Sequence, residues 1–98
     1  MKPSPQDISH LPGGGRMLRG LEDWRGGRTT VDSCLVAIAF GKFRDAGLVS
    51  GEAPFPQAEL VLYGLLQKEG GNAYGRYNSL LRELVSFGRA LARWQRES

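Results

Sequence analysis

Arginine is the residue type in this 98-residue chain whose spacing most clearly allows a specific chemistry. Ten of the thirteen basic residues are arginines, and a guanidinium group can bind a carboxylate or a phosphate through two parallel hydrogen bonds. Four of them, near the C-terminus, are separated by seven, four and three residues: Arg82, Arg89, Arg93 and Arg96. On a helix of about 3.6 residues per turn, these four fall within roughly 60° of each other. This arginine stripe is typical of a surface that meets an acidic protein face, nucleic-acid phosphates or anionic lipid.

A simpler interpretation of the arginine stripe remains open. The solvated face of a helix must be polar, and cations near the C-terminal end of a helix compensate its dipole by about 0.3–1 kcal/mol each. Arg82 is too far from the C-terminus to contribute in this way, but the other three are not. Against this, Arg89 and Arg93 are like charges four residues apart, which destabilises a helix by about 0.2–0.5 kcal/mol.

The charge of the chain is distributed unevenly. The formal net charge is +3, with a local excess of +2 over residues 16–28 and +3 over residues 76–98, against −2 over residues 29–75. The positive charge therefore lies at the two ends of the expected folded region, where an anionic partner would be attracted.

Groups suited to catalysis or metal binding are scarce. His10 is the only imidazole and Cys34 the only thiol, so the chain cannot build a structural zinc site or an internal disulfide. Cys34 lies among apolar residues, which is typical of an inert buried thiol. The segment Gly13–Arg16 lacks the Gly-Lys-Ser/Thr of a phosphate loop, although its glycines could present backbone N–H groups to an anion. We therefore expect no enzyme, no cofactor and no metal.

The expected elements are helical. Residues 1–15 contain three prolines, three consecutive glycines and little apolar material, which predicts a mobile tail. A folded domain is expected over residues 16–98. The helices predicted by apolar spacing and by cap residues are a short one over 16–25, strongly apolar ones over 31–46 and 57–69, and a long amphipathic one over 73–97. One face of the last helix carries the candidate core residues Tyr77, Leu80, Leu84, Phe87 and Leu91.

The last two predicted helices also allow a nucleic-acid interpretation. Residues 57–97, with the turn Gly70–Asn72, match the length of a helix-turn-helix unit. In that arrangement, bases or phosphates would be contacted by Arg76, Asn78, Ser79 and Arg82. Further phosphate contacts could come from the basic N-terminal segment, through Arg16, Arg19, Arg25 and Arg28. An ordinary helical hairpin of the core explains the same pattern.

These observations predict an all-α fold, a small bundle of about four helices. The apolar content of 31–46 and 57–69 is high for so small a domain, so we expect a homodimer or a constitutive protein partner. No apolar run approaches the roughly 20 residues of a membrane span and no signal-peptide core is present, so a cytoplasmic location is expected. The function expected is a non-catalytic interaction module: a small regulator, inhibitor or complex subunit. The alternative is a DNA- or RNA-binding regulator.

Overall fold

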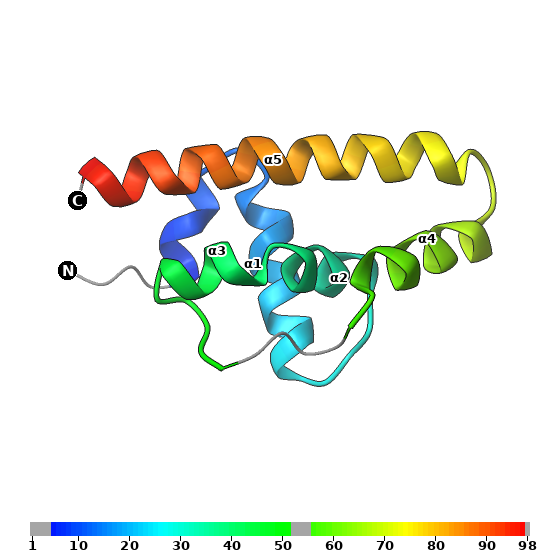
Figure 1. The fold of residues 1–98 in the computed structure, drawn as a ribbon, viewed down its shortest axis with the longest axis horizontal. Coiled ribbons are helices and arrows are strands. Elements are labelled where there is room, and N and C mark those ends of the chain that lie inside the picture. Colours follow the sequence, from blue (N-terminus) through cyan, green and yellow to red (C-terminus); the bar gives the residue numbers. More distant parts are fainter. Residues whose placement is uncertain (1–4, 52–55, 98) are drawn as a thin grey trace.

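The computed structural model describes residues 5–51 and 56–97, and for residues 5–7 and 97 it describes the backbone only. The described residues are helical, without strands. They form a 3₁₀ helix, η1 (Pro5–His10), and five α-helices: α1 (Gly14–Arg25), α2 (Val31–Ile38), α3 (Phe40–Asp45), α4 (Ala58–Glu69) and α5 (Ala73–Glu97). Helix α5 runs along the length of the molecule, α1 runs across it, and α4 turns back into α5 at one end (Figure 1). The all-α fold class is confirmed.

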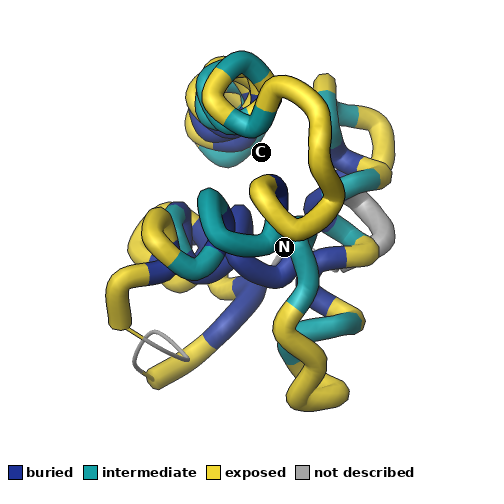
Figure 2. The backbone as a smooth tube through the Cα atoms, turned by 90° about the vertical axis from the view of Figure 1, so that its right-hand side faces the viewer, coloured by how far each residue is buried: buried dark blue, intermediate teal, exposed yellow. Residues whose placement is uncertain are grey.

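Every helix contributes to the core, and α5 and α2 contribute the most buried residues. Leu80, Leu84, Phe87 and Leu91 of α5 are buried, as the spacing predicted, while Tyr77 is half-buried. In α2 five consecutive residues, from Ser33 to Ala37, are buried, because this helix is enclosed by neighbours on several sides. Figure 2 views α5 nearly end-on, with its buried positions toward the other helices.

The helix expected over 31–46 is interrupted at Ala39, which has φ −97° and ψ 19° and separates α2 from α3. The bend lets two aromatic rings of α3 reach different partners in the core. Phe40 lies edge-on to Trp24, with ring centroids 5.5 Å apart, and Phe43 stacks on Phe87 at 5.6 Å. A straight helix through Ala39 would direct these rings elsewhere, so the prediction of one helix is wrong.

Helix α2 starts with Thr30 as its N-cap. The Thr30 side chain accepts a hydrogen bond from the Ser33 N–H at 3.1 Å, and the Ser33 hydroxyl accepts one from the Thr30 N–H at 2.8 Å. This reciprocal capping box satisfies two backbone donors that would otherwise have no partner. It also places Asp32 in the first turn of α2, where the helix dipole favours a negative charge.

Part of the expected N-terminal tail belongs to the folded structure. Residues 1–4 lie outside the described residues, but η1 packs against α1 and the Ile8 side chain is fully buried in the core. Leu11 packs against the same core. Ile8 and Leu11 therefore differ from the expectation that residues 1–15 bury too little to join the domain, because η1 and the turn after it direct both side chains to the core.

The described part of the chain has no helix that is both long enough and apolar enough to cross a bilayer.

Replacing Ile8 by alanine tests whether η1 contributes to stability. Because Ile8 is fully buried, Ile8→Ala is expected to lower the free energy of unfolding by about 2–5 kcal/mol, as measured by urea denaturation. Gln67, an exposed residue of α4, provides the control, and Gln67→Ala should change the stability by no more than about 0.5 kcal/mol. An equally small effect of Ile8→Ala would show that η1 does not hold the core together.

Candidate functional site

The arginine stripe lies on the outer side of α5. Arg82, Arg89, Arg93 and Arg96 are all exposed, and Leu80, Leu84 and Leu91 are buried on the opposite side of the same helix. The burial of the apolar face therefore fixes the stripe toward solvent. The rotation of α5 about its axis is set by the core and not by the arginines.

Three of the four stripe arginines have no internal partner among the described residues. The Arg82 Nε donates a hydrogen bond of 3.4 Å to the Asn78 carbonyl within α5. No hydrogen bond or ion pair links Arg89, Arg93 or Arg96 to another described residue. No described carboxylate compensates their positive charges, which are therefore available to bind an anionic ligand.

The simpler interpretation of the stripe accounts for only part of it. Helix α5 continues to Glu97, and Arg96 is the only basic residue in its last turn. The effect of the helix dipole falls off within that turn, so Arg89 and Arg93 gain little from it. Compensation of the helix dipole therefore explains the position of Arg96, but not those of Arg89 and Arg93.

A groove lies next to the stripe, between the start of α1 and the first half of α5. It consists of two adjoining open hollows of about 520 and 540 Å³ that share Ser79 and Arg82. The first is lined by Arg16, Asn72, Gly75, Arg76, Ser79, Leu80 and Arg82. The second is lined by Pro12, Gly13, Ser79, Arg82, Glu83 and Ser86. We call the two hollows together the basic groove.

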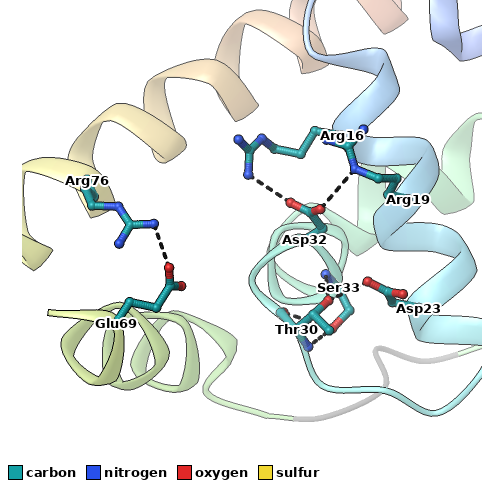
Figure 3. A network of polar contacts seen from close by, with 8 residues as sticks. All are labelled: Arg16, Arg19, Asp23, Thr30, Asp32, Ser33, Glu69 and Arg76. Carbon is teal, nitrogen blue, oxygen red and sulfur yellow. Dashed lines mark hydrogen bonds and ion pairs between the residues drawn. The ribbon is translucent and has the colours of Figure 1, made fainter.

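Arg16 is held at the groove by a close approach of α1 and α2. A Cβ atom on Gly20 of α1 would overlap the carbonyl oxygen of Asp32, so only glycine permits this packing. The Asp32 carboxylate then lies 2.9 Å from the Arg16 Nη1 and 3.5 Å from the Arg19 Nε. One carboxylate is shared by two guanidinium groups, which leaves excess positive charge on this wall of the groove (Figure 3).

The opposite wall is formed by Arg76. Its Nη2 lies 3.1 Å from the Glu69 Oε2, across the turn between α4 and α5. Both side chains are close to half exposed, and exposed pairs of this kind contribute only about 0–1 kcal/mol. Figure 3 shows Arg16 and Arg76 extending toward each other from different helices.

The starts of two helices also border the groove. Gly13, with φ 75°, is the N-cap of α1 and lines the second hollow. Asn72 directly precedes α5, and its Oδ1 accepts a hydrogen bond of 3.0 Å from the Gly75 N–H. The N-terminal end of a helix carries a partial positive charge, so the α5 dipole favours an anion in the first hollow and the α1 dipole favours one in the second.

The structure brings together most of the residues expected in the nucleic-acid alternative. Arg76, Ser79 and Arg82 line the groove with Arg16, whereas Asn78 is half-buried and does not line it. Among the other N-terminal arginines, Arg19 shares Asp32 with Arg16, Arg25 donates to the Leu48 carbonyl at 3.3 Å, and Arg28 pairs with Asp23. The sequence pattern did not predict that Gly75 and Ser86 line the groove. Both are small residues that continue the line of Asn72 and Ser79 at helical spacing.

The thiol and the imidazole lie away from the groove lining. Cys34 is fully buried, and burial raises the pKa of its thiol to about 11, so the sulfur is protonated at neutral pH. His10 is exposed at the end of η1. No three metal-binding side chains gather within the described residues.

The turn that leads into α2 predicts a specific acid sensitivity. Asp23 accepts hydrogen bonds from the Thr30 hydroxyl at 2.7 Å and from the Arg28 Nε at 3.1 Å, and the Thr30 bond is the main cause that lowers the pKa of this carboxyl. A lowered folded-state pKa means stability that is present above the ordinary pKa, near 3.8, and is lost as the pH falls through the folded-state value. Asp23→Asn should therefore flatten the loss of stability below about pH 4, measured by thermal melts between pH 6 and pH 2.5. The control is Asp45→Asn, because the Asp45 carboxylate has no described ion pair, and this variant should leave the loss of stability unchanged. If both variants behave alike, the Asp23 contacts do not stabilise the turn.

The described residues thus place two basic features side by side on α5, the arginine stripe and the basic groove, which share Arg82. Comparison with models of protein families, with curated proteins and with solved structures gives no match for this chain.

Proposed function

We propose that this protein is a non-catalytic interaction module that docks an anionic partner surface through the outer side of α5. The observation that carries the proposal is the set of three exposed, unpaired guanidinium groups on Arg89, Arg93 and Arg96. Like charges three and four residues apart repel each other, and no described carboxylate relieves them. An anionic partner would remove this repulsion and gain charge-assisted hydrogen bonds at the same time.

The proposal is tested by retention on an immobilised sulfated polyanion such as heparin. Arg89→Gln/Arg93→Gln is expected to elute at clearly lower salt than the unaltered protein, because electrostatic binding weakens with each lost contact. The matched control, Arg25→Gln/Lys68→Gln, removes the same net charge from α1 and α4 and should elute close to the unaltered protein. Equal elution of the two double variants would show that net charge alone causes retention, and the proposal would fail.

We also propose self-association through the apolar surface that the fold leaves uncovered. Leu60 of α4 and Tyr74 and Val85 of α5 are 68%, 68% and 52% exposed. Exposed apolar groups are common in small numbers, but on two adjacent helices they favour contact with a second copy, since most soluble oligomers are homo-oligomers.

Light scattering at micromolar concentration tests the homodimer. The unaltered chain should give about twice the monomer mass, and Leu60→Glu/Val85→Glu should give the monomer mass, because buried unpaired charges oppose association. A monomer mass for the unaltered chain across this range would disprove the dimer.

A further inference from the structure

We infer that the basic groove binds the phosphate backbone of a nucleic-acid duplex, and that the arginine stripe continues the same binding track. This inference rests on the proposed function, because it identifies the anionic partner that α5 docks. The argument depends on which groups line the groove, how exposed their charges are and how far the track extends.

The groove is lined by the groups that proteins use to contact phosphates. These are arginines, small hydroxyl or amide side chains, and the starts of helices. All three kinds meet in this groove: guanidinium groups from two helices, Asn72 and two serines, and the N-terminal ends of α1 and α5. The side chains concerned are Arg16, Asn72, Arg76, Ser79, Arg82 and Ser86.

The first hollow is open to solvent and includes small residues. Gly75 and Ser79 line it together with Arg76 and Arg82. The Asn72 side chain lies over Gly75, so that a Cβ atom there would come within 2.5 Å of the Asn72 Nδ2. With its oxygen occupied by the α5 cap, Asn72 has its amide N–H groups to donate.

The groove arginines can exchange their internal partners for a ligand at a small cost in free energy. The Arg82 side chain donates one hydrogen bond, of 3.4 Å, to the Asn78 carbonyl of its own helix. Arg76 forms an exposed ion pair with Glu69. Arg16 shares its carboxylate with Arg19. Glu83 is the one acidic residue that lines either hollow.

The length of the track favours a polymer over a single anionic group. Arg82 and Arg96 lie on one face of α5 and are fourteen residues apart, which corresponds to about 21 Å at 1.5 Å per residue. One phosphate or one phosphorylated side chain reaches a single part of this track. A duplex carries a phosphate about every 3.4 Å along each strand and can contact all of it.

The chemistry of the lining favours nucleic acid over an acidic protein. Interfaces between proteins have an apolar, aromatic-rich centre, whereas interfaces with nucleic acid are more polar and strongly positive. Leu80 is the only large apolar side chain that lines either hollow, and it is 7% exposed. No aromatic residue lines them, so the groove lacks the stacking platform on which single-strand binding depends.

The test is fluorescence anisotropy with a labelled DNA duplex of mixed sequence, titrated at several salt concentrations between 50 and 200 mM. Each phosphate contact contributes about −0.9 to the slope of log K against log salt. Arg76→Gln/Ser79→Glu removes one cation from the groove and adds one anion without altering the stripe. It is expected to weaken duplex binding by about tenfold and to reduce the slope by about 0.9. Arg25→Gln/Lys68→Gln, with the same net charge, should bind as the unaltered protein does.

The outcomes separate this inference from the proposed function. Failure of the unaltered protein to bind the duplex at 50 mM salt, or tighter binding to a single strand of the same length, would overturn the inference. So would unchanged duplex binding by Arg76→Gln/Ser79→Glu, with its folding verified by a cooperative thermal melt. If heparin retention still depends on Arg89 and Arg93 in those cases, the proposed function stands and only the nucleic-acid partner is rejected.

Discussion

The packing of one face of α5 against the core is the constraint on which the rest of this surface depends. Leu84, Phe87 and Leu91 belong to one buried cluster with residues of α1, α2, α3 and α4, and the stacking of Phe43 on Phe87 ties α3 to the same face. Burial of each such side chain stabilises the fold by about 1.5–3 kcal/mol, far more than the charges on the opposite face cost by mutual repulsion. Hydrophobic burial therefore decides the rotation of α5. The arginine stripe is left exposed as a consequence, without internal compensation.

A second constraint is the contact between α1 and α2. Gly20 lets the two helices approach until backbone atoms meet, and this brings Asp32 within reach of two guanidinium groups. The Thr30 capping box and the Asp23 hydrogen bonds hold the preceding turn in the conformation that this approach requires. Arg16 is thereby directed along α5 instead of into solvent. Its place on the groove wall depends on a glycine and a carboxylate that do not line the groove.

The two basic features of α5 differ in how they are built. The stripe comes from a single helix, so its geometry follows from helical periodicity alone. The groove combines the first half of α5 with the start of α1, and Arg16 and Arg76 are already partly paired there. A ligand at the stripe meets unpaired charges, whereas a ligand at the groove must compete with Glu69 and Asp32 for the guanidinium groups.

The sequence alone was sufficient for the features that repeat at helical spacing. The boundaries of α5, the four residues that it buries most deeply, the cap at Thr30 and the exposure of Arg82, Arg89, Arg93 and Arg96 all follow from local pattern and cap chemistry. The break at Ala39 did not follow, because alanine favours helix, whereas the contacts of Phe40 with Trp24 and of Phe43 with Phe87 that accompany the break join residues far apart in the chain.

Tertiary structure alone decided the burial of Ile8, the position of Arg16 and the existence of the basic groove. Each of these depends on contacts between residues far apart in the chain. Arg16 and Arg82 are more than sixty residues apart, and they line one hollow only because α1 crosses beneath α5 (Figure 1). Periodicity reports which side of a helix is apolar, but which other helix covers that side is determined by the packing of the whole domain.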